Sequence, residues 1–194
     1  TRFIGAGLEL GGKDPAYVRS DCNLEHAIEN LVDGSYFNSG QSCCGIERIY
    51  VDENIYDKFV DGFKSITEKY ILGNPLEENT NLGPVVRMNA AKYIRTQVSQ
   101  ALNKGAKNII DSNIFKADDG INCYVSPSAL IQVDHSMEFM KEETFGPIVG
   151  VSKFIELSKA LMMANDTPYG LAAYVFSKNI DEIKYLSSNL DYGN

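Results

Sequence analysis

Helical and strand spacings of hydrophobic residues alternate along the first half of the chain. After Asp21, a candidate N-cap, helical spacing predicts a helix with a buried face of Leu24, Ala27, Ile28, Leu31, Val32 and Ser35. The β-branched and aromatic run 46–51 predicts a strand. Asp52 is expected to cap a second helix, whose inward residues are Ile55, Phe59, Val60, Phe63 and Ile66. The polar, turn-rich stretch 74–84 predicts a loop.

The alternation continues in the second half. A third helix is expected from Arg87 to Lys104, with Gly105 suited to the position just past its end. Further strands or extended stretches are predicted at 106–110, 124–133, 148–154 and 172–176, and further helices around 157–164 and 183–190. The class is therefore α/β, a three-layer α/β/α arrangement with a largely parallel sheet covered on both faces. With no repeat or internal boundary, residues 1–194 are predicted to form a single domain.

Composition narrows the classes of function. The 194 residues are 44 % hydrophobic, which is enough for a sizeable core, and the formal net charge of −8 disfavours nucleic acid or an anionic membrane as a partner. No apolar run has the length of a membrane span, and the first ten residues lack the features of a signal peptide. Because the chain also lacks an initiator methionine, it is expected to be cut from a longer protein.

The four cysteines are Cys22, Cys43, Cys44 and Cys123, and no pair has zinc-site spacing, so no metal site is predicted. So few cysteines in a chain of this size favour free thiols in a reducing compartment, which is expected to be the cytoplasm, with the mitochondrial matrix as the alternative.

The glycine-rich segment 5–13 does not fit a dinucleotide fingerprint or a phosphate-binding loop. Leu10 stands where the fingerprint needs its third glycine, and only four residues precede Gly5, too few for a full strand. The residue after Lys13 is not the Ser or Thr that a phosphate-binding loop requires.

Segment 37–45 joins the first predicted helix to the following strand and contains Cys43 and Cys44. Loops on a rigid frame often carry catalytic groups, and small neighbours would let a substrate approach a thiol. The alternative is that both cysteines are small buried hydrophobes. Another alternative is a cysteine hydrolase that pairs Cys43 with His26 or His135.

Two further segments, 141–147 and 165–171, join segments 5–13 and 37–45 as candidate motifs. Read alone, the first is a solvated acidic loop, and the second is a helix stop followed by a turn. Taken in order, the four segments resemble the motifs of the aldehyde dehydrogenase superfamily: Leu8-Glu9-Leu10-Gly11-Gly12-Lys13, Gly40-Gln41-Ser42-Cys43, Glu143-Thr144-Phe145-Gly146-Pro147, and Asn165 with Tyr169-Gly170-Leu171.

The resemblance implies a role for each motif. Cys43 would be the nucleophile that forms a thiohemiacetal and then a thioester, and Glu9 would activate the water that hydrolyses it. Glu9 and Cys43 are therefore expected to face each other across one cleft, with Glu143 and Phe145 on its rim. Glu143, Phe145 and Leu10 would contact NAD or NADP. Phe37, Ser42 and Cys44 would line the tunnel for a small aldehyde.

The family also has parts that these residues do not contain. The resemblance implies a catalytic domain truncated at both ends, with most of the cofactor-binding domain before it and a pairing tail after it, in a homo-oligomeric whole. Segment Arg2–Gly7 departs from the family, which usually has a β-type stretch there. Alone, the chain is expected to fold without useful turnover. The alternative from another class is a non-catalytic structural or interaction module.

Overall fold

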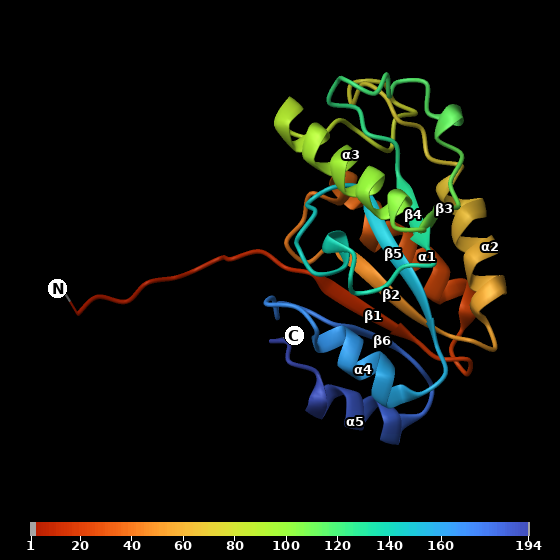
Figure 1. Cartoon of the computed structure of the whole chain (residues 1–194), viewed down its shortest axis with the longest axis vertical. Helices are drawn as coiled ribbons and strands as arrows, with labels where there is room; N and C mark the ends of the chain where they lie inside the picture. Colours follow the sequence, from red (N-terminus) through yellow and green to blue (C-terminus); the bar gives the residue numbers. More distant parts are fainter. Residues whose placement is uncertain (1–2, 194) are drawn as a thin grey trace.

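A computed structural model describes residues 3–193, in which one six-stranded sheet forms the centre (Figure 1). The strand order is β3-β4-β5-β2-β1-β6, and every neighbouring pair is parallel except the antiparallel pair of β3 and β4. The strands are β1 (Asp14–Val18), β2 (Ile46–Asp52), β3 (Lys107–Asn108), β4 (Ser128–Ile131), β5 (Ile148–Phe154) and β6 (Tyr174–Phe176). The predicted α/β class with a largely parallel sheet is confirmed.

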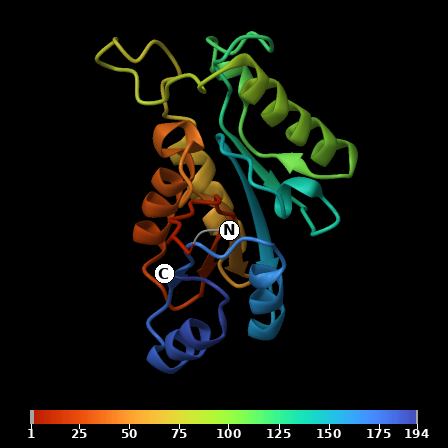
Figure 2. The same ribbon diagram turned by 90° about the vertical axis from the view of Figure 1, so that its left-hand side faces the viewer.

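Helices cover both faces of the sheet. They are α1 (Leu24–Tyr36), α2 (Tyr56–Thr67), α3 (Met88–Asn103), α4 (Leu157–Asn165) and α5 (Ile180–Asn189), with short 3-10 turns η1 (Phe37–Gly40), η2 (Ser112–Ile114) and η3 (Glu138–Met140). Figure 2 shows α1 and α2 on one side of the strands and α3 and α4 on the other. None of the helices in the described range 3–193 is long and apolar enough to cross a membrane.

Alternation along the strands divides the core in two. Ala16 and Val18 of β1 pack in one cluster with α1 and α2, whereas Tyr17 between them packs in the other with α3, α4 and Leu186 of α5. Successive side chains of a strand point to opposite faces, so a fully buried strand supplies both clusters. This arrangement gives the expected three layers.

Several predicted boundaries shift. Asn23, not Asp21, caps α1 and accepts from the His26 N–H, while Asp21 accepts from the Ser177 hydroxyl. α2 begins at Tyr56 without a side-chain cap, because Asp52 instead accepts from the Asn54 N–H and the Ser20 hydroxyl. Extended segment 106–110 pairs over only two residues, and 124–133 over four. Gly105 does follow α3 with the expected positive φ, +100°.

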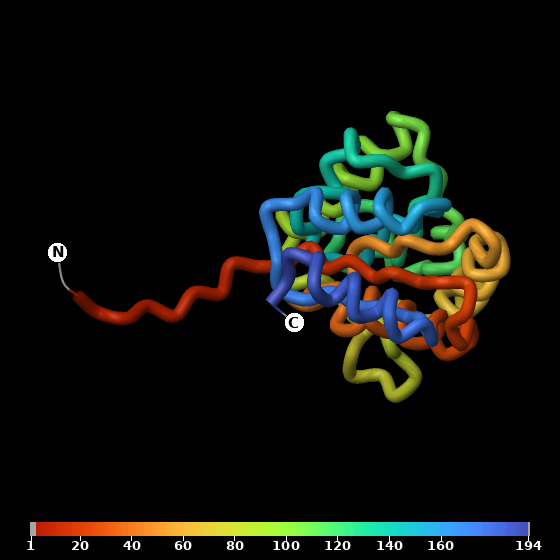
Figure 3. The backbone as a smooth tube through the Cα atoms, turned by 90° about the horizontal axis from the view of Figure 1, so that it is seen from below, coloured from red at the N-terminus to blue at the C-terminus, as the bar shows by residue number. Residues whose placement is uncertain are grey.

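The N-terminal segment differs most from expectation. Alternation between Leu8 and Leu10 suggests a strand there, but residues 3–10 are exposed, pair with no strand of the described chain, and run away from the body (Figure 3). The first strand instead begins at Asp14, and the sequence analysis did not predict it. Arg2, the first residue of the departing segment Arg2–Gly7, lies outside the described residues.

The strand directions bring the motif segments to one edge of the sheet. Gly12 precedes β1, Cys43 precedes β2, Phe145 precedes β5 and Gly170 precedes β6, and these four strands are mutually parallel. Parallel strands that start at one edge place their preceding loops side by side. All four motifs therefore enter the sheet from the same side.

Candidate active site

The loop before Cys43 is pinned to a neighbouring segment. Two successive residues, Asn38 and Ser39, adopt left-handed backbone conformations with φ of 50° and 57°. The Ser39 hydroxyl donates to the Gly83 carbonyl at 2.7 Å, and the Gln41 side-chain oxygen accepts from the Val86 N–H at 2.7 Å. These contacts hold strained backbone in place, as is common beside functional groups.

Two glycines allow the motif segments to touch. Strand register pairs Asp14 with Ile46, which brings Gly12 beside Cys43. A Cβ on Gly12 would lie 2.0 Å from the Cys43 carbonyl oxygen. At Gly40, where φ is +70°, a Cβ would lie 2.1 Å from the Gly146 carbonyl oxygen. Only glycine permits these approaches, so the Glu9, Cys43 and Glu143 motifs meet backbone to backbone.

Glu143 closes this contact. Its Oε1 accepts from the Gly12 N–H at 2.9 Å, and Gly11, with φ of +84°, leaves room for the carboxylate. Partial burial raises the pKa of Glu143 above its usual range. Among the hydrogen bonds of residues 3–193, none uses Glu143 Oε2. One carboxylate oxygen thus remains available to accept from a ligand.

Cys43 is half-buried, whereas Cys44 is exposed. The Ser42 hydroxyl lies 3.3 Å from the Cys44 sulfur, and the Cys44 carbonyl accepts from the Tyr174 hydroxyl at 3.1 Å. All four cysteines are free thiols, as the sequence predicted. Cys43 lies where the segment before β1 meets the segment before β2, and the contacts that fix its loop include no hydrogen bond to its sulfur among the described residues.

The structure does not bring Glu9 beside Cys43. Both Glu9 and Leu10 are exposed within the extended N-terminal segment, which no described hydrogen bond fastens to the body before Gly12. Sequence reasoning expected Glu9 and Cys43 to face each other across a cleft. Some displacement of Glu9 is expected where the N-terminal segment has no neighbouring strands, and without pairing nothing directs its carboxylate inward.

The remaining expected site residues lie at the surface. Phe37 is 66 % exposed and Phe145 is 41 % exposed, each unusually open for a phenylalanine. Phe145 also has a positive φ of 52°. Exposed aromatic rings in the two segments that carry Cys43 and Glu143 are compatible with a binding surface rather than a core.

Neither histidine pairs with Cys43 in the described structure. The His26 ring approaches the Asn30 amide at 3.2 Å, on the exposed face of α1. His135 lies between the Tyr50 hydroxyl at 2.9 Å and Asp166 at 2.7 Å, and burial lowers its pKa, although Asp166 opposes that shift. The hydrolase alternative therefore lacks its base.

Sequence reasoning missed a buried charged cluster under the site, formed by Lys13, Asp14, Glu47 and Arg48. Lys13 pairs with Glu47, and the Arg48 guanidinium donates from Nε to the Lys13 carbonyl at 3.0 Å and from Nη2 to the Ala164 carbonyl at 3.0 Å. Buried charges need such partners to offset lost hydration. The sequence did contain a sign of this cluster, because charged residues stand at the starts of two apolar strands, β1 and β2.

Asp14 gives a prediction about pH. Its Oδ1 accepts from the Ala172 N–H at 3.1 Å, its buried Oδ2 has no partner among the described residues, and burial raises its pKa from 3.8 to about 7. Between these values the folded state holds a proton that the unfolded state releases, so stability falls as pH rises.

Asp14→Asn removes this titration and keeps an oxygen for Ala172. The difference in unfolding free energy, variant minus wild type, is expected to rise by about 2 kcal/mol between pH 5 and pH 8. Urea unfolding at both pH values measures it. Parallel pH profiles for the two proteins would contradict the assignment of a buried proton to Asp14.

The sequence matches the Aldehyde dehydrogenase family over residues 1–194, and the chain belongs to that family. It is 37 % identical over 187 residues to lactaldehyde dehydrogenase of Escherichia coli, covering 96 % of this chain and 38 % of the relative. It is 37 % identical over 186 residues to human mitochondrial aldehyde dehydrogenase, covering 96 % and 35 %. The chain thus spans less than two-fifths of the length of these relatives.

Solved structures agree. An aldehyde dehydrogenase from Brucella melitensis biovar abortus 2308 superposes with a TM-score of 0.89 at 32 % identity, covering 95 % of this chain and 37 % of that one. Betaine aldehyde dehydrogenase from Staphylococcus aureus, in complex with NAD+, gives 0.87 at 33 %, covering 95 % and 37 %. Glyceraldehyde-3-phosphate dehydrogenase from Methanocaldococcus jannaschii, complexed with NADP, gives 0.88 at 31 %, covering 95 % and 39 %. The family resemblance read from the motifs is confirmed, and both cofactors that it implied occur among the relatives.

Proposed function

We propose that the whole protein, meaning this chain with any sequence that precedes or follows it, oxidises an aldehyde to a carboxylic acid with NAD or NADP as hydride acceptor. The observation that carries the proposal is the convergence of Gly12, Cys43 and Glu143 through a close backbone approach and a 2.9 Å hydrogen bond. Relatives named for different aldehydes share the family, so the substrate is proposed only as a small aldehyde.

Cys43 is the proposed nucleophile. Its thiolate adds to the aldehyde carbonyl and forms a C–S bond, and the carbonyl oxygen takes up negative charge. The Cys43 N–H donates to no acceptor among the described residues, and a free backbone donor beside the nucleophile suits stabilisation of that oxyanion. Loss of hydride from the adduct then leaves a thioester on Cys43.

Glu143 and Phe145 are proposed to hold the cofactor, whose nicotinamide ring supplies the hydride-accepting chemistry when bound. The unused Oε2 of Glu143 fits this role because a ribose hydroxyl donates hydrogen bonds that a carboxylate accepts. The half-exposed ring of Phe145 offers an apolar surface beside that carboxylate. Leu10 would join them if segment 3–10 folds onto the body.

Phe37, Ser42 and Cys44 are proposed to line the approach to Cys43. All three lie within nine residues of chain around the nucleophile, and Phe37 and Cys44 are exposed. A small aldehyde that packs against them would remove the apolar surface of the Phe37 ring and the Cys44 methylene from water. This burial favours binding of the substrate near Cys43.

Glu9 is the proposed general base for the second step, in which water attacks the thioester and releases the acid. Glu9→Gln in the whole protein is expected to lower steady turnover about 100-fold while an initial burst of reduced cofactor persists, because the carboxylate acts only after hydride loss. Stopped-flow absorbance measures both phases.

Glu29→Gln is the matched control, since Glu29 is an exposed carboxylate on α1 outside the motifs. Its burst and its steady rate should equal those of the wild type. A Glu9→Gln enzyme with an unchanged steady rate would exclude Glu9 as the base, and one that loses burst and steady rate together would assign Glu9 to the first step.

A further inference from the structure

Glu47 is a buried carboxylate whose contacts lie on another motif. It is the second residue of β2 and only 3 % exposed. Its oxygens accept from the Thr144 N–H at 2.9 Å and from the Phe145 N–H at 2.9 Å. Both donors are backbone groups of the segment that carries Glu143. Glu47 therefore binds that segment without a hydrogen bond to the side chain of Glu143 or Phe145.

The conformation of Phe145 explains why such a contact is needed. Its φ of 52° lies in the left-handed region, which a bulky aromatic residue seldom adopts. Two successive N–H groups that turn toward one point form a concave anion site, known as a nest. Here the anion is supplied by the protein itself, and the nest formed by Thr144 and Phe145 is filled by Glu47.

Lys13 supplies the opposite charge. Its ammonium pairs with Glu47, and the two side chains are 0 % and 4 % exposed. Lys13 follows Gly12, whose N–H donates to Glu143 Oε1 at 2.9 Å. The pair therefore links the start of β1, the start of β2 and the Thr144–Phe145 nest, which are three of the four places where the motif segments enter the sheet.

We propose that Glu47 is a positioning residue for the cofactor: as the anion of the Thr144–Phe145 nest, it holds the backbone that presents the Phe145 ring and the Glu143 carboxylate. This role rests on the proposed function. Glu47 acts through the backbone alone, so both presented side chains stay available to a ligand. Cys43 itself meets Gly12 rather than Thr144 or Phe145, so loss of the nest contact is expected to affect cofactor binding more than the reacting thiol.

Glu47→Gln in the whole protein tests the proposal. Glutamine has the same size, but it carries no charge and turns an amide donor toward Lys13 or the nest. The KM for NAD+ or NADP+ is expected to rise at least about tenfold, with kcat within about threefold, because hydrogen bonds to a charged group are lost. Amide hydrogen exchange in residues 141–147 of the unliganded protein should become faster.

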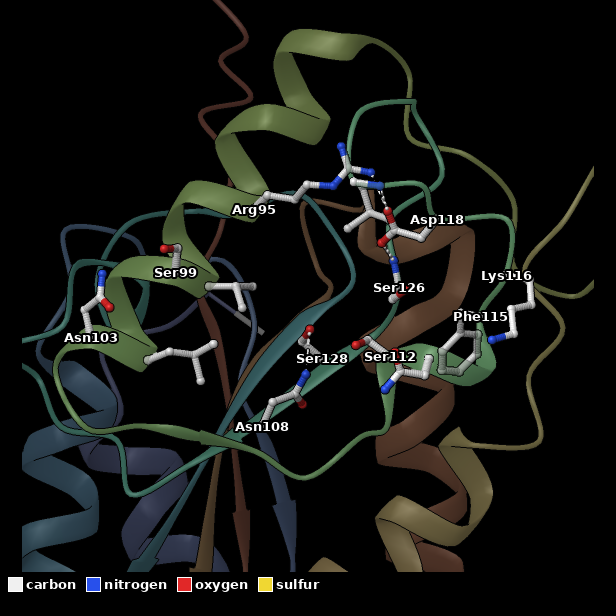
Figure 4. Close-up of a pocket in the computed structure, with 15 residues that line it drawn as sticks. Arg95, Ser99, Asn103, Asn108, Ser112, Phe115, Lys116, Asp118, Ser126 and Ser128 are labelled. Carbon is white, nitrogen blue, oxygen red and sulfur yellow. Dashed lines mark hydrogen bonds and ion pairs between the residues drawn. The ribbon is translucent and has the colours of Figure 1, made fainter.

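Asp118→Asn is the matched control. Asp118 also accepts from two backbone N–H groups, Ser126 at 2.8 Å and Gly120 at 2.9 Å, and pairs with Arg95 at 2.7 Å. It does so beside an open pocket of about 590 Å³ under α3, whose lining includes none of the motif residues (Figure 4). Its cofactor KM and the exchange of residues 141–147 should match the wild type.

Lys13→Met combined with Glu47→Gln covers the case in which Glu47→Gln alone does not fold. It removes the ion pair without leaving an unpaired charge, a change that buried pairs often tolerate. The double variant should fold and show the same rise in KM and faster exchange. An unchanged cofactor KM in either folded variant would overturn the proposal. So would changes in KM and kcat no larger than those of Asp118→Asn. A wild-type protein without turnover would instead refute the proposed function, while the exchange measurement would still test the nest.

Discussion

Cys43→Ser in the whole protein is expected to lower aldehyde oxidation by at least about 10⁴-fold, because loss of the nucleophile removes the covalent route entirely. A serine hydroxyl has nearly the shape of the thiol but is rarely ionised near neutral pH. The contacts that hold the loop, from Gly12, Gly40 and Gln41, do not involve the sulfur. Folding should therefore be retained, and cofactor reduction measured by absorbance gives the effect.

Cys44→Ser provides the comparison. It makes the same chemical change one residue away, at an exposed side chain whose sulfur approaches the Ser42 hydroxyl at 3.3 Å. Its rate should stay within about tenfold of the wild type, as expected for a side chain that lies near the substrate but forms no covalent bond with it. If the two variants lose activity equally, the nucleophile assignment is wrong.

Gly12→Ala is expected to cost about 3 kcal/mol of unfolding free energy, as overpacking against an immovable neighbour does. The new Cβ would lie 2.0 Å from the Cys43 carbonyl oxygen and 3.1 Å from Asp14 Oδ1. The first neighbour is backbone, so relief requires the β1 and β2 entries to separate. In the whole protein the same displacement should lower turnover about 100-fold, since a shift of about 1 Å in the position of the thiol can reduce the rate by that factor.

Gly7→Ala is the control within the same segment, because nothing lies within 4 Å of its added Cβ. Its stability should match the wild type. Denaturant midpoints for the two variants measure the contrast. A Gly12→Ala protein as stable as Gly7→Ala would mean that the Gly12–Cys43 approach is absent in solution.

The sequence predicted the elements whose burial is one-sided. Helix α1 and strand β5 emerged with nearly their final bounds, because one face of α1 and the first four residues of β5 are apolar and buried. Strand β1 was missed, since Asp14 and Pro15 begin it and both are polar or strand-breaking by type. Their burial depends on Ala172, β2 and β6, which pair with β1 from far along the chain.

The candidate site divides in the same way. Motif resemblance alone named Cys43 and Glu143 as candidate site residues, without any geometry. The contact between Gly12 and Cys43 follows from the β1–β2 register, and the Glu47 nest follows from a left-handed turn at Phe145. Neither register nor backbone conformation can be read from a single sequence. Glu9 shows the opposite case. The motif named it as the candidate base, but its position depends on pairing partners for segment 3–10.

The site also lies at the less expected end of the sheet. Open α/β sheets usually bind ligands beyond the carboxyl ends of their strands. Here Gly12, Cys43 and Phe145 all precede the strands that they lead into, so they gather at the amino ends. Sequence reasoning that searched only the loops after strands would have overlooked them.

The most direct test of the account is to trap the covalent intermediate. The whole protein carrying Glu9→Gln is mixed with NAD+ or NADP+ and a panel of aldehydes that includes lactaldehyde and glutarate semialdehyde, quenched in acid, and mapped by peptide mass spectrometry. If Cys43 is the nucleophile, it carries an adduct with the mass of the aldehyde less two hydrogens, because the aldehyde hydrogen leaves as hydride and the thiol loses its proton. Aldehyde oxidation that proceeds with no adduct on Cys43, or with the adduct on Cys22, Cys44 or Cys123, would contradict it.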